Sequence, residues 1–277
     1  DKIAALKQQM QQLQAIDGQM KAAPDQQVSL TDPDARSMKN RDGGIVGYNV
    51  QTAVDAEHHL IVAHEVVTDG VDRNQLSAVA EQARAATGIE NLTVVADRGY
   101  YKGEQILACT NAGITALVPK TLTSNSRAEG RFDKQDFIYI AGEDEYRCPA
   151  GERAIWRMTT VERGLTLHRY WSSACPRCPI KGQCTPSDYR RITRWEHEAV
   201  LDEMQQRLDR QPEMMRVRRR TVEHPFGTIK TWMGWTHFLT KTLAHVRTEM
   251  SLHVLAYNLK RVMRILGIGE LLRVLTA

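Results

Sequence analysis

The sequence has no run of 18 apolar residues and no secretory signal pattern near its start. A membrane-spanning helix needs about 20 mostly apolar residues, so no segment of this chain qualifies. An initiator methionine is also missing, because the chain opens on Asp1 inside a helical pattern. We therefore expect a fragment or a mature form of a longer protein.

Cysteine is scarce, with five residues in 277. An odd number without a secretory signal argues against a disulfide framework and favours a reducing cytoplasm. Cys109 falls in a predicted helix and is expected to be buried and inert. The other four lie close together in a polar segment: Cys148, Cys175, Cys178 and Cys184.

The spacing of these four cysteines lets their thiolates close a tetrahedral, structural Zn²⁺ site. A bound metal would stabilise a loop-rich segment that has only a small core. His168 or His197 could replace one of the thiolates. The alternative is four reduced thiols without a metal. A redox role is disfavoured, because no thioredoxin-like βαβ unit surrounds Cys175 and Cys178.

Neither sign of charge dominates, since 37 Lys and Arg residues face 33 Asp and Glu residues, for a net charge of +4. Such a mildly basic chain can bind nucleic acid but need not do so. The clustering of charge is more informative. Glu223 is the one carboxylate in residues 216–230, a segment that also carries five strong cations: Arg216, Arg218, Arg219, Arg220 and Lys230. This is either a solvated basic helix face, or a metal-binding carboxylate among cations that hold phosphate.

Hydrophobic periodicity predicts an α/β protein whose core is split by an insertion. Residues 1–22 form a helical segment, either a short coiled coil or the packed end of an upstream insertion or linker. Residues 23–120 are the first part of the core, residues 121–195 a Cys-containing insertion rich in loops and strands, and residues 196–277 the helices that complete the core. Within these last helices, the expected buried stripe consists of Leu252, Leu255, Leu259, Val262 and Leu266.

Two supersecondary units are expected within residues 23–120. Alternating polarity over residues 45–55, followed by a turn and a second strand over residues 60–67, predicts an antiparallel hairpin. A helix over residues 72–86 follows. The second unit is a βαβ unit made of a strand, a helix and a strand: residues 92–96, 102–111 and 114–118.

Asp97 follows the first strand of the predicted βαβ unit directly. The carboxyl ends of strands are where open α/β sheets place their sites, although an Asp here could simply cap the next helix. Glu223 comes from a distant helix. Carboxylates that converge from separate elements suit two-metal phosphoryl transfer, in which the ions lie about 3.5–4 Å apart. Oxygen ligands select Mg²⁺ or Mn²⁺.

Four sequence blocks resemble the conserved blocks of bacterial insertion-sequence transposases of the DDE class: residues 47–55, 96–100, 222–230 and 255–261. The resemblance covers nearly the whole chain. It implies a ribonuclease-H-like mixed sheet flanked by helices. It also implies a bacterial, nucleoid-associated protein that binds transposon ends and target DNA, and a homodimer assembled on that DNA.

The resemblance also assigns roles to individual residues. Asp97 matches the second catalytic carboxylate and Glu223 the third. Arg219 and Lys230 match the Arg and Lys of the Tyr-Arg-Glu-Lys signature, which hold phosphates of the transposon end. The Tyr of that signature falls at position 216, where this chain has Arg.

The first catalytic Asp of the family is expected upstream of Asp1, on a strand that precedes the hairpin. If so, this fragment alone is inactive. Within the chain the alternatives, in order, are Asp55, Asp32 and Asp34. Pro225 places Glu223 either at a helix kink or near a helix start.

The leading hypothesis is therefore a transposase catalytic domain. It would cleave DNA at insertion-sequence ends and transfer the strand by in-line attack of water or a 3′-hydroxyl, with the cations of residues 216–230, Trp232 and Trp235 holding the DNA. One rival is a ribonuclease-H-like nuclease without strand transfer. The other is a non-catalytic, zinc-ribbon DNA-binding remnant of a decayed element.

Overall fold

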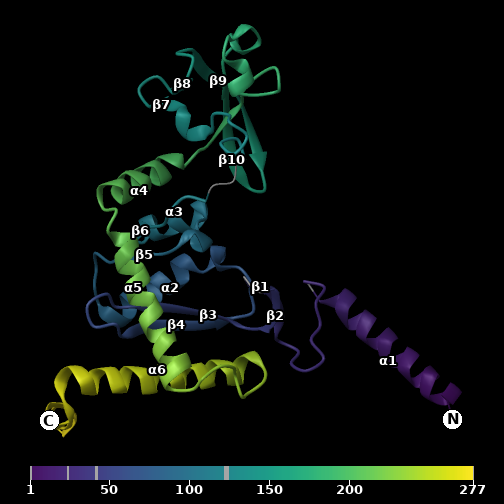
Figure 1. The fold of residues 1–277 in the computed structure, drawn as a ribbon, viewed down its shortest axis with the longest axis vertical. Coiled ribbons are helices and arrows are strands. Elements are labelled where there is room, and N and C mark those ends of the chain that lie inside the picture. The colour runs from purple at the N-terminus through teal and green to yellow at the C-terminus, as the bar shows by residue number, and fades with distance from the viewer. Residues whose placement is uncertain (1, 24, 41–42, 122–124, 277) are drawn as a thin grey trace. The chain divides into compact units, whose positions relative to one another are not determined.

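The computed structural model of the protein describes residues 2–23, 25–40, 43–121 and 125–276. The chain divides into two compact units, which are described separately (Figure 1). Unit 1 combines Asp1–Val118 with Leu208–Ala277, and unit 2 is Pro119–Arg207. Helices and strands occur in both, as the sequence predicts for an α/β protein.

The predicted N-terminal helix is confirmed as α1 (Lys2–Ala22). None of its residues is buried, and all but Ile16 of the apolar side chains at three- and four-residue steps are exposed. Ile3 is 71% exposed and Leu13 is 65% exposed. The expected packing of this stripe on the rest of the chain is therefore absent from the part that the structure describes.

Unit 1 contains three two-stranded sheets. The predicted hairpin is confirmed, since β3 (Asn49–Val54) pairs antiparallel with β4 (Ile61–Val67), Val50 opposite Val66. The βαβ unit is also confirmed, because β5 (Thr93–Val95) and β6 (Thr115–Leu117) run parallel. A third pair, β1 (Arg36–Asn40) with β2 (Gly43–Gly47), was not predicted as a separate hairpin. Among the described residues, β3–β4 and β5–β6 do not join into one mixed sheet.

Short helices follow the strands of unit 1. The helix predicted over residues 72–86 is found as the 3₁₀ turn η1 (Asp72–Asn74) and α2 (Leu76–Thr87), whose apolar face buries Leu76, Ala80 and Ala83. Gly88 ends α2 in the left-handed conformation, with φ of 69°. The turn η2 (Arg98–Tyr100) and α3 (Gly103–Asn111) connect β5 to β6.

The C-terminal part of unit 1 is helical: α5 (Met214–Gly227), the π-helical turn η6 (Thr228–Trp232), α6 (Leu243–Leu266) and α7 (Ile268–Thr276). Figure 1 shows α6 alongside the β3–β4 hairpin, and the two share a core of buried side chains. In this core α6 supplies Val246, Met250, Val254 and Tyr257, against Ile61 and Val66 of β4 and Ile229 of η6.

The predicted buried stripe of α6 was wrong. Leu252 is 62% exposed and Leu255 is 63% exposed, while Met250 and Val254 are buried. Residues two positions apart lie about 200° apart around a helix, at 3.6 residues per turn. Both sets of residues have helical spacing, so the face that packs is chosen by the hairpin rather than by the periodicity of α6.

Unit 2 is built on a five-stranded antiparallel sheet in the order β11-β10-β9-β8-β7. Its strands are β7 (Ile138–Ile140), β8 (Glu145–Arg147), β9 (Arg153–Glu162), β10 (Leu165–Trp171) and β11 (Ile192–Trp195). Short 3₁₀ turns accompany them: η3 (Lys134–Asp136), η4 (Cys175–Arg177) and η5 (Lys181–Gln183). The helix α4 (Glu198–Arg210) follows β11. Among the described residues, no helix has the length and apolar character needed to cross a membrane.

Candidate active site

Asp97 stands where β5 ends and η2 begins. Its backbone is extended, and its Oδ1 accepts a hydrogen bond of 2.8 Å from the Gly99 N–H. This is the helix-capping role that the sequence analysis gave as the alternative to a role in a reaction site. The cap uses one carboxylate oxygen, so the same side chain can serve chemistry through the other.

The second oxygen of Asp97 is bound by an arginine from a distant element. Arg218 of α5 donates from Nη2 to Asp97 Oδ2 over 2.7 Å. The Asp97 side chain is 42% exposed and that of Arg218 is 22% exposed, so solvent screens this ion pair in part. A cation that binds Asp97 would compete with this guanidinium.

A second carboxylate, Asp72, lies beside Asp97. A Cβ atom on Gly99 would come within 3.0 Å of Asp97 Oδ1 and 3.3 Å of Asp72 Oδ2, so the two carboxylates flank this glycine. Asp72 Oδ1 accepts hydrogen bonds of 2.8 Å from the side-chain amides of both Asn49 and Gln51. Asp72 was not among the residues predicted from the sequence, because an Asp at a helix start gives no signal beyond that of a cap.

Tyr100 links these groups to the hairpin. Its hydroxyl donates to Gln51 Oε1, and the Gln51 side chain is 1% exposed. Burial raises the pKa of Tyr100, and the negative charges of Asp72 and Asp97 raise it further. The phenol therefore stays protonated and remains a hydrogen-bond donor. The network joins the start of β3 to the end of β5.

A cavity of about 450 Å³ runs along both of these strands. All of β3 and β5 line it, Asp72, Asp97 and Tyr100 belong to its wall, and α2 and α5 supply mostly apolar side chains. Within the described part of the chain, β3 pairs only with β4 and β5 only with β6. Each strand therefore presents to the cavity an edge that has no strand neighbour.

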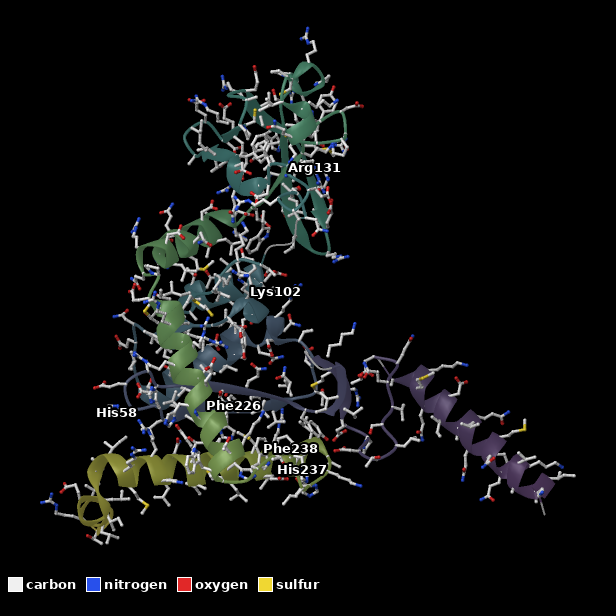
Figure 2. All side chains as sticks on the ribbon, viewed as in Figure 1. His58, Lys102, Arg131, Phe226, His237 and Phe238 are labelled. Atoms are coloured by element: carbon white, nitrogen blue, oxygen red, sulfur yellow. The ribbon has the colours of Figure 1, made fainter. Side chains whose placement is uncertain are left out.

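The helix α5 presents its charged residues on two faces. Arg218 lines the cavity together with Val222 and Phe226, which is labelled in Figure 2. Glu223 is exposed, and so are the neighbouring cations at helical steps of three, four and seven residues: Arg216, Arg219 and Arg220. Lys230, in η6, is also exposed, and its Nζ lies 5.9 Å from the Phe226 ring centroid. The structure thus brings Arg218 to Asp97, while Glu223 is not part of the cavity wall.

Pro225 lies inside α5, which continues to Gly227 and then into η6. Glu223 is therefore on a helix that extends beyond it in both directions. Of the two arrangements foreseen for this carboxylate, a position near the helix start is excluded.

The alternative candidates for the first Asp are engaged elsewhere. Asp55 accepts from the His58 N–H at the far end of β3, about 20 Å from Asn49 for six residues at about 3.3 Å each. Asp32 and Asp34 accept from the backbone N–H groups of Thr242 and Leu243 at the start of α6. None of the three joins the Asp72–Asp97 pair.

Two carboxylates beside one glycine offer the hard oxygen ligands that Mg²⁺ and Mn²⁺ prefer. Among the described residues, no group of three or more His, Cys, Asp or Glu side chains is arranged to hold a metal ion. The donors at Asp72 and Asp97 thus fit a divalent ion in kind, and further ligands would have to join them.

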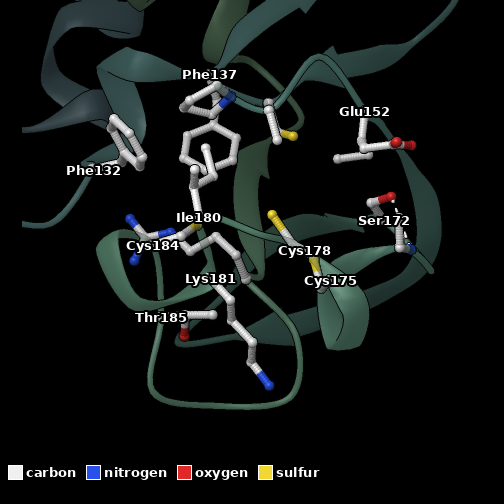
Figure 3. A pocket seen from close by; sticks show the side chains of 16 residues that line it. Phe132, Phe137, Glu152, Ser172, Cys175, Cys178, Ile180, Lys181, Cys184 and Thr185 are labelled. Atoms are coloured by element: carbon white, nitrogen blue, oxygen red, sulfur yellow. Dashed lines mark hydrogen bonds between the residues drawn. The ribbon is translucent and has the colours of Figure 1, made fainter.

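The four clustered cysteines line one cavity in unit 2, three of them labelled in Figure 3. All are free thiols: Cys148, Cys175, Cys178 and Cys184. His168 and His197 are not in the cavity wall. Cys109 is fully buried, as predicted, and burial raises its pKa to about 11.

Comparison with known proteins gives one result. No curated protein and no solved structure matches the chain. A family model described as "Transposase DDE domain" matches residues 8–259. This match spans most of the 277 residues. The chain therefore belongs to the transposase DDE domain family.

Proposed function

We propose that this chain is the catalytic domain of an insertion-sequence transposase, which cleaves DNA at the ends of the element and transfers the strand by in-line phosphoryl transfer. The observation that carries the proposal is the pair of carboxylates, Asp72 and Asp97, beside Gly99 at the carboxyl end of β5. Polar groups at this position in an α/β protein suit a reaction site.

Asp97 and Asp72 would hold Mg²⁺ or Mn²⁺. Glu223, which is exposed on α5 outside the cavity wall, would contribute the third carboxylate only after a rearrangement that turns it toward this pair. Such an ion, when bound, polarises phosphoryl oxygens and lowers the pKa of water. Without a metal, Arg218 would balance the charge of Asp97, since its Nη2 donates to Asp97 Oδ2. Tyr100 and the two amides of Asn49 and Gln51 fix the orientation of Asp72.

We further propose that one more strand fills the cavity between β3 and β5, and that it carries a fourth carboxylate, the first catalytic Asp that the family resemblance implies. Both strands offer unpaired backbone edges to this cavity, and buried backbone groups are almost always paired. The lining from α2 and α5 is mostly apolar, which suits a strand buried on both faces. Without this strand the site would lack a ligand and be inactive.

The exposed face of α5 would hold the DNA backbone. Arg216, Arg219 and Arg220 share this face with Glu223, so phosphates bound there would lie next to a metal-binding carboxylate. Arg218 would join them once it leaves Asp97, and Lys230 extends the cationic surface. We propose a bacterial, nucleoid-associated protein that forms a homodimer when assembled on element ends.

A structural Zn²⁺ in unit 2 is a separate proposal. Its support is the convergence of four free thiols on one cavity. Two of the ligand segments are tight turns, in which the Gly151 N–H donates to the Cys148 carbonyl and the Cys178 N–H to the Cys175 carbonyl. Since no set of three such side chains in the described residues is already arranged for a metal, binding would draw the thiols inward.

The decisive experiment is a strand-transfer assay on the natural protein that carries this chain, with a labelled element end, target DNA and Mg²⁺. We expect cleaved and joined products, and we expect Asp97→Asn to lose both while it still binds DNA. Cleavage without joining would support the nuclease instead. DNA binding without metal-dependent cleavage would support the non-catalytic remnant. An Asp97→Asn variant as active as the parent would overturn the proposed site.

A further inference from the structure

A second pocket, of about 330 Å³, lies in unit 1 and shares no lining residue with the cavity beside Asp97. Its wall comes from three consecutive elements of the C-terminal region. The lining residues are His224, Thr228, Trp232, Tyr257, Lys260, Arg261 and Arg264. The sequence hypothesis expected Trp232 to hold DNA, but neither the family match nor the proposed reaction assigns a role to the pocket that it lines.

The floor of the pocket is formed by hydrogen-bonded side chains. Tyr257 is 1% exposed, and its hydroxyl donates to the His59 carbonyl over 2.7 Å. The same oxygen lies 3.0 Å from His224 Nδ1. A hydroxyl has only one proton to donate, so here it accepts and His224 donates from Nδ1. The rings of His59 and His224 stack with their centroids 4.9 Å apart.

The pocket carries positive charge that no neighbour in its wall neutralises. Lys260, Arg261 and Arg264 all line it, and no Asp or Glu is among the described lining residues. Burial lowers the pKa of His224, and the charges of Arg261, His59 and Arg264 lower it further. The imidazole is therefore neutral at pH 7, and the positive charge of the pocket comes from Lys260, Arg261 and Arg264. The pocket suits an anion.

Trp232 adds an aromatic surface at the rim. Its side chain is 80% exposed, one of the largest exposed fractions among the apolar side chains of the chain. Exposed aromatic rings beside cations are the recurring means by which proteins bind single-stranded nucleic acid, because every base can stack on them. A pocket for a phosphate beside a surface for a base matches one nucleotide of a strand.

We infer that this pocket binds a backbone phosphate of a DNA strand through Lys260 and Arg264, with an unpaired base stacked on Trp232. The choice of DNA rests on the proposed function. The pocket lies apart from the Asp97 site, so it would hold a strand away from the point of cleavage. Single-stranded or unpaired DNA should bind better here than duplex, because bases within a duplex are already stacked.

The test measures affinity for a labelled single strand of about 16 nucleotides by fluorescence anisotropy, over a range of salt concentrations. Lys260→Ala combined with Arg264→Ala should lower the affinity about ten-fold. It should also reduce the salt slope by about 1.4, at about 0.7 for each phosphate contact. The matched control is Arg247→Ala combined with Arg273→Ala, which removes the same charge from cations already paired with Glu65 and Glu270.

Trp232 is tested separately. Trp232→Ala should lower single-strand affinity about ten-fold, and Trp232→Phe should restore most of it, because a phenyl ring still stacks. Trp156, 50% exposed in unit 2, provides the control Trp156→Ala. Equal losses in the two double variants, or an unchanged affinity in Trp232→Ala, would overturn the inference. The inference would also fail if inorganic phosphate binds this pocket while the same variants leave the affinity for DNA unchanged.

These outcomes are separable from those of the proposed function. Asp97→Asn should bind the single strand as the parent does, because Asp97 is not in this pocket. If the parent binds DNA through Lys260 and Arg264 but never cleaves it, the catalytic proposal fails and the pocket stands. If cleavage is intact and the pocket variants bind normally, the pocket fails and the catalytic proposal stands.

Discussion

Arg218 and Asp97, 121 residues apart in the sequence, form an ion pair of 2.7 Å from Nη2 to Oδ2. Replacing Arg218 by Gln should change the free energy of unfolding by less than about 1 kcal/mol, because both side chains are partly exposed. It should lower the Mn²⁺ concentration needed for half-maximal cleavage, because the guanidinium no longer competes for Oδ2. Urea denaturation and a Mn²⁺ titration measure the two effects. Arg207→Gln, on α4 and paired with Glu203, is the control. An unchanged or higher Mn²⁺ requirement would contradict a competing role.

Asp72→Ala should destabilise unit 1 by about 1–3 kcal/mol, because two side-chain amides at 2.8 Å would lose their acceptor and Gln51 is buried. Chemical denaturation measures this loss. Asp17→Ala on the exposed helix α1 serves as the control and should change little. If Asp72→Ala proves as stable as the parent, the Asp72 network does not position this site.

Gly99→Ala tests how closely the two carboxylates approach. The added methyl would lie 3.0 Å from Asp97 Oδ1 and 3.3 Å from Asp72 Oδ2, so at least one carboxylate must move. The carboxylates would have to give way by a few tenths of an ångström, so we expect a loss of cleavage smaller than the about 100-fold that a misplacement of about 1 Å causes. The thermal midpoint should change far less. Gly182→Ala, where an added methyl has nothing within 4 Å, is the matched substitution. Full cleavage activity in Gly99→Ala would show that the two carboxylates need no such placement.

Unit 2 should contain one zinc ion per chain, measured by elemental analysis of protein purified without chelator. Burial raises the pKa of Cys184 and the thiols of Cys175, Cys148 and Cys178 raise it further, against the opposing charge of Arg190. The four thiols line one cavity, and a bound cation would relieve this mutual effect. Cys178→Ser should lose the zinc, and the thermal midpoint should fall on chelation. Cys109→Ser should retain the metal. Metal-free protein with an unchanged midpoint in chelator would count against the site.

The stability of unit 2 should depend on pH through Glu198. Burial raises the pKa of Glu198, but Lys134, the Trp195 N–H and Lys120 outweigh it and leave the pKa below its usual value. The lowered pKa adds stability at pH values above the ordinary pKa of about 4.3, and this stability is lost as the pH falls through the pKa of the folded state.

Glu198→Gln should weaken the acid dependence of the unfolding free energy. Lys134→Met should destabilise unit 2 at pH 7 by less than the about 3–5 kcal/mol that breaking a fully buried pair costs, because Lys134 is 35% exposed and Lys120 remains 3.8 Å from Glu198 Oε1. An acid dependence that is identical in Glu198→Gln would exclude this pair as its source.

Local pattern predicted much of unit 1 correctly. The β3–β4 hairpin, the βαβ unit and the position of Asp97 at a strand end all follow from residues close together in sequence. Helix α2 likewise buries Ala80 and Ala83 as its periodicity predicts. These features follow from the alternation of polar and apolar residues, from helical spacing and from turn residues, all of which can be recognised within short segments of the chain.

The sequence by itself thus determined the β3–β4 hairpin, the βαβ unit, the family-specific blocks and the cluster of cations around Glu223. Only the tertiary structure decided which face of α6 is buried, which arginine meets Asp97, and that Asp72 stands beside it. Each of these depends on contacts between residues far apart in sequence. Two faces of one helix can have the same apolar periodicity, and packing against the hairpin decides which of them is buried. The five cations of residues 216–230 carry the same charge, and the packing of α5 decides which of them meets Asp97.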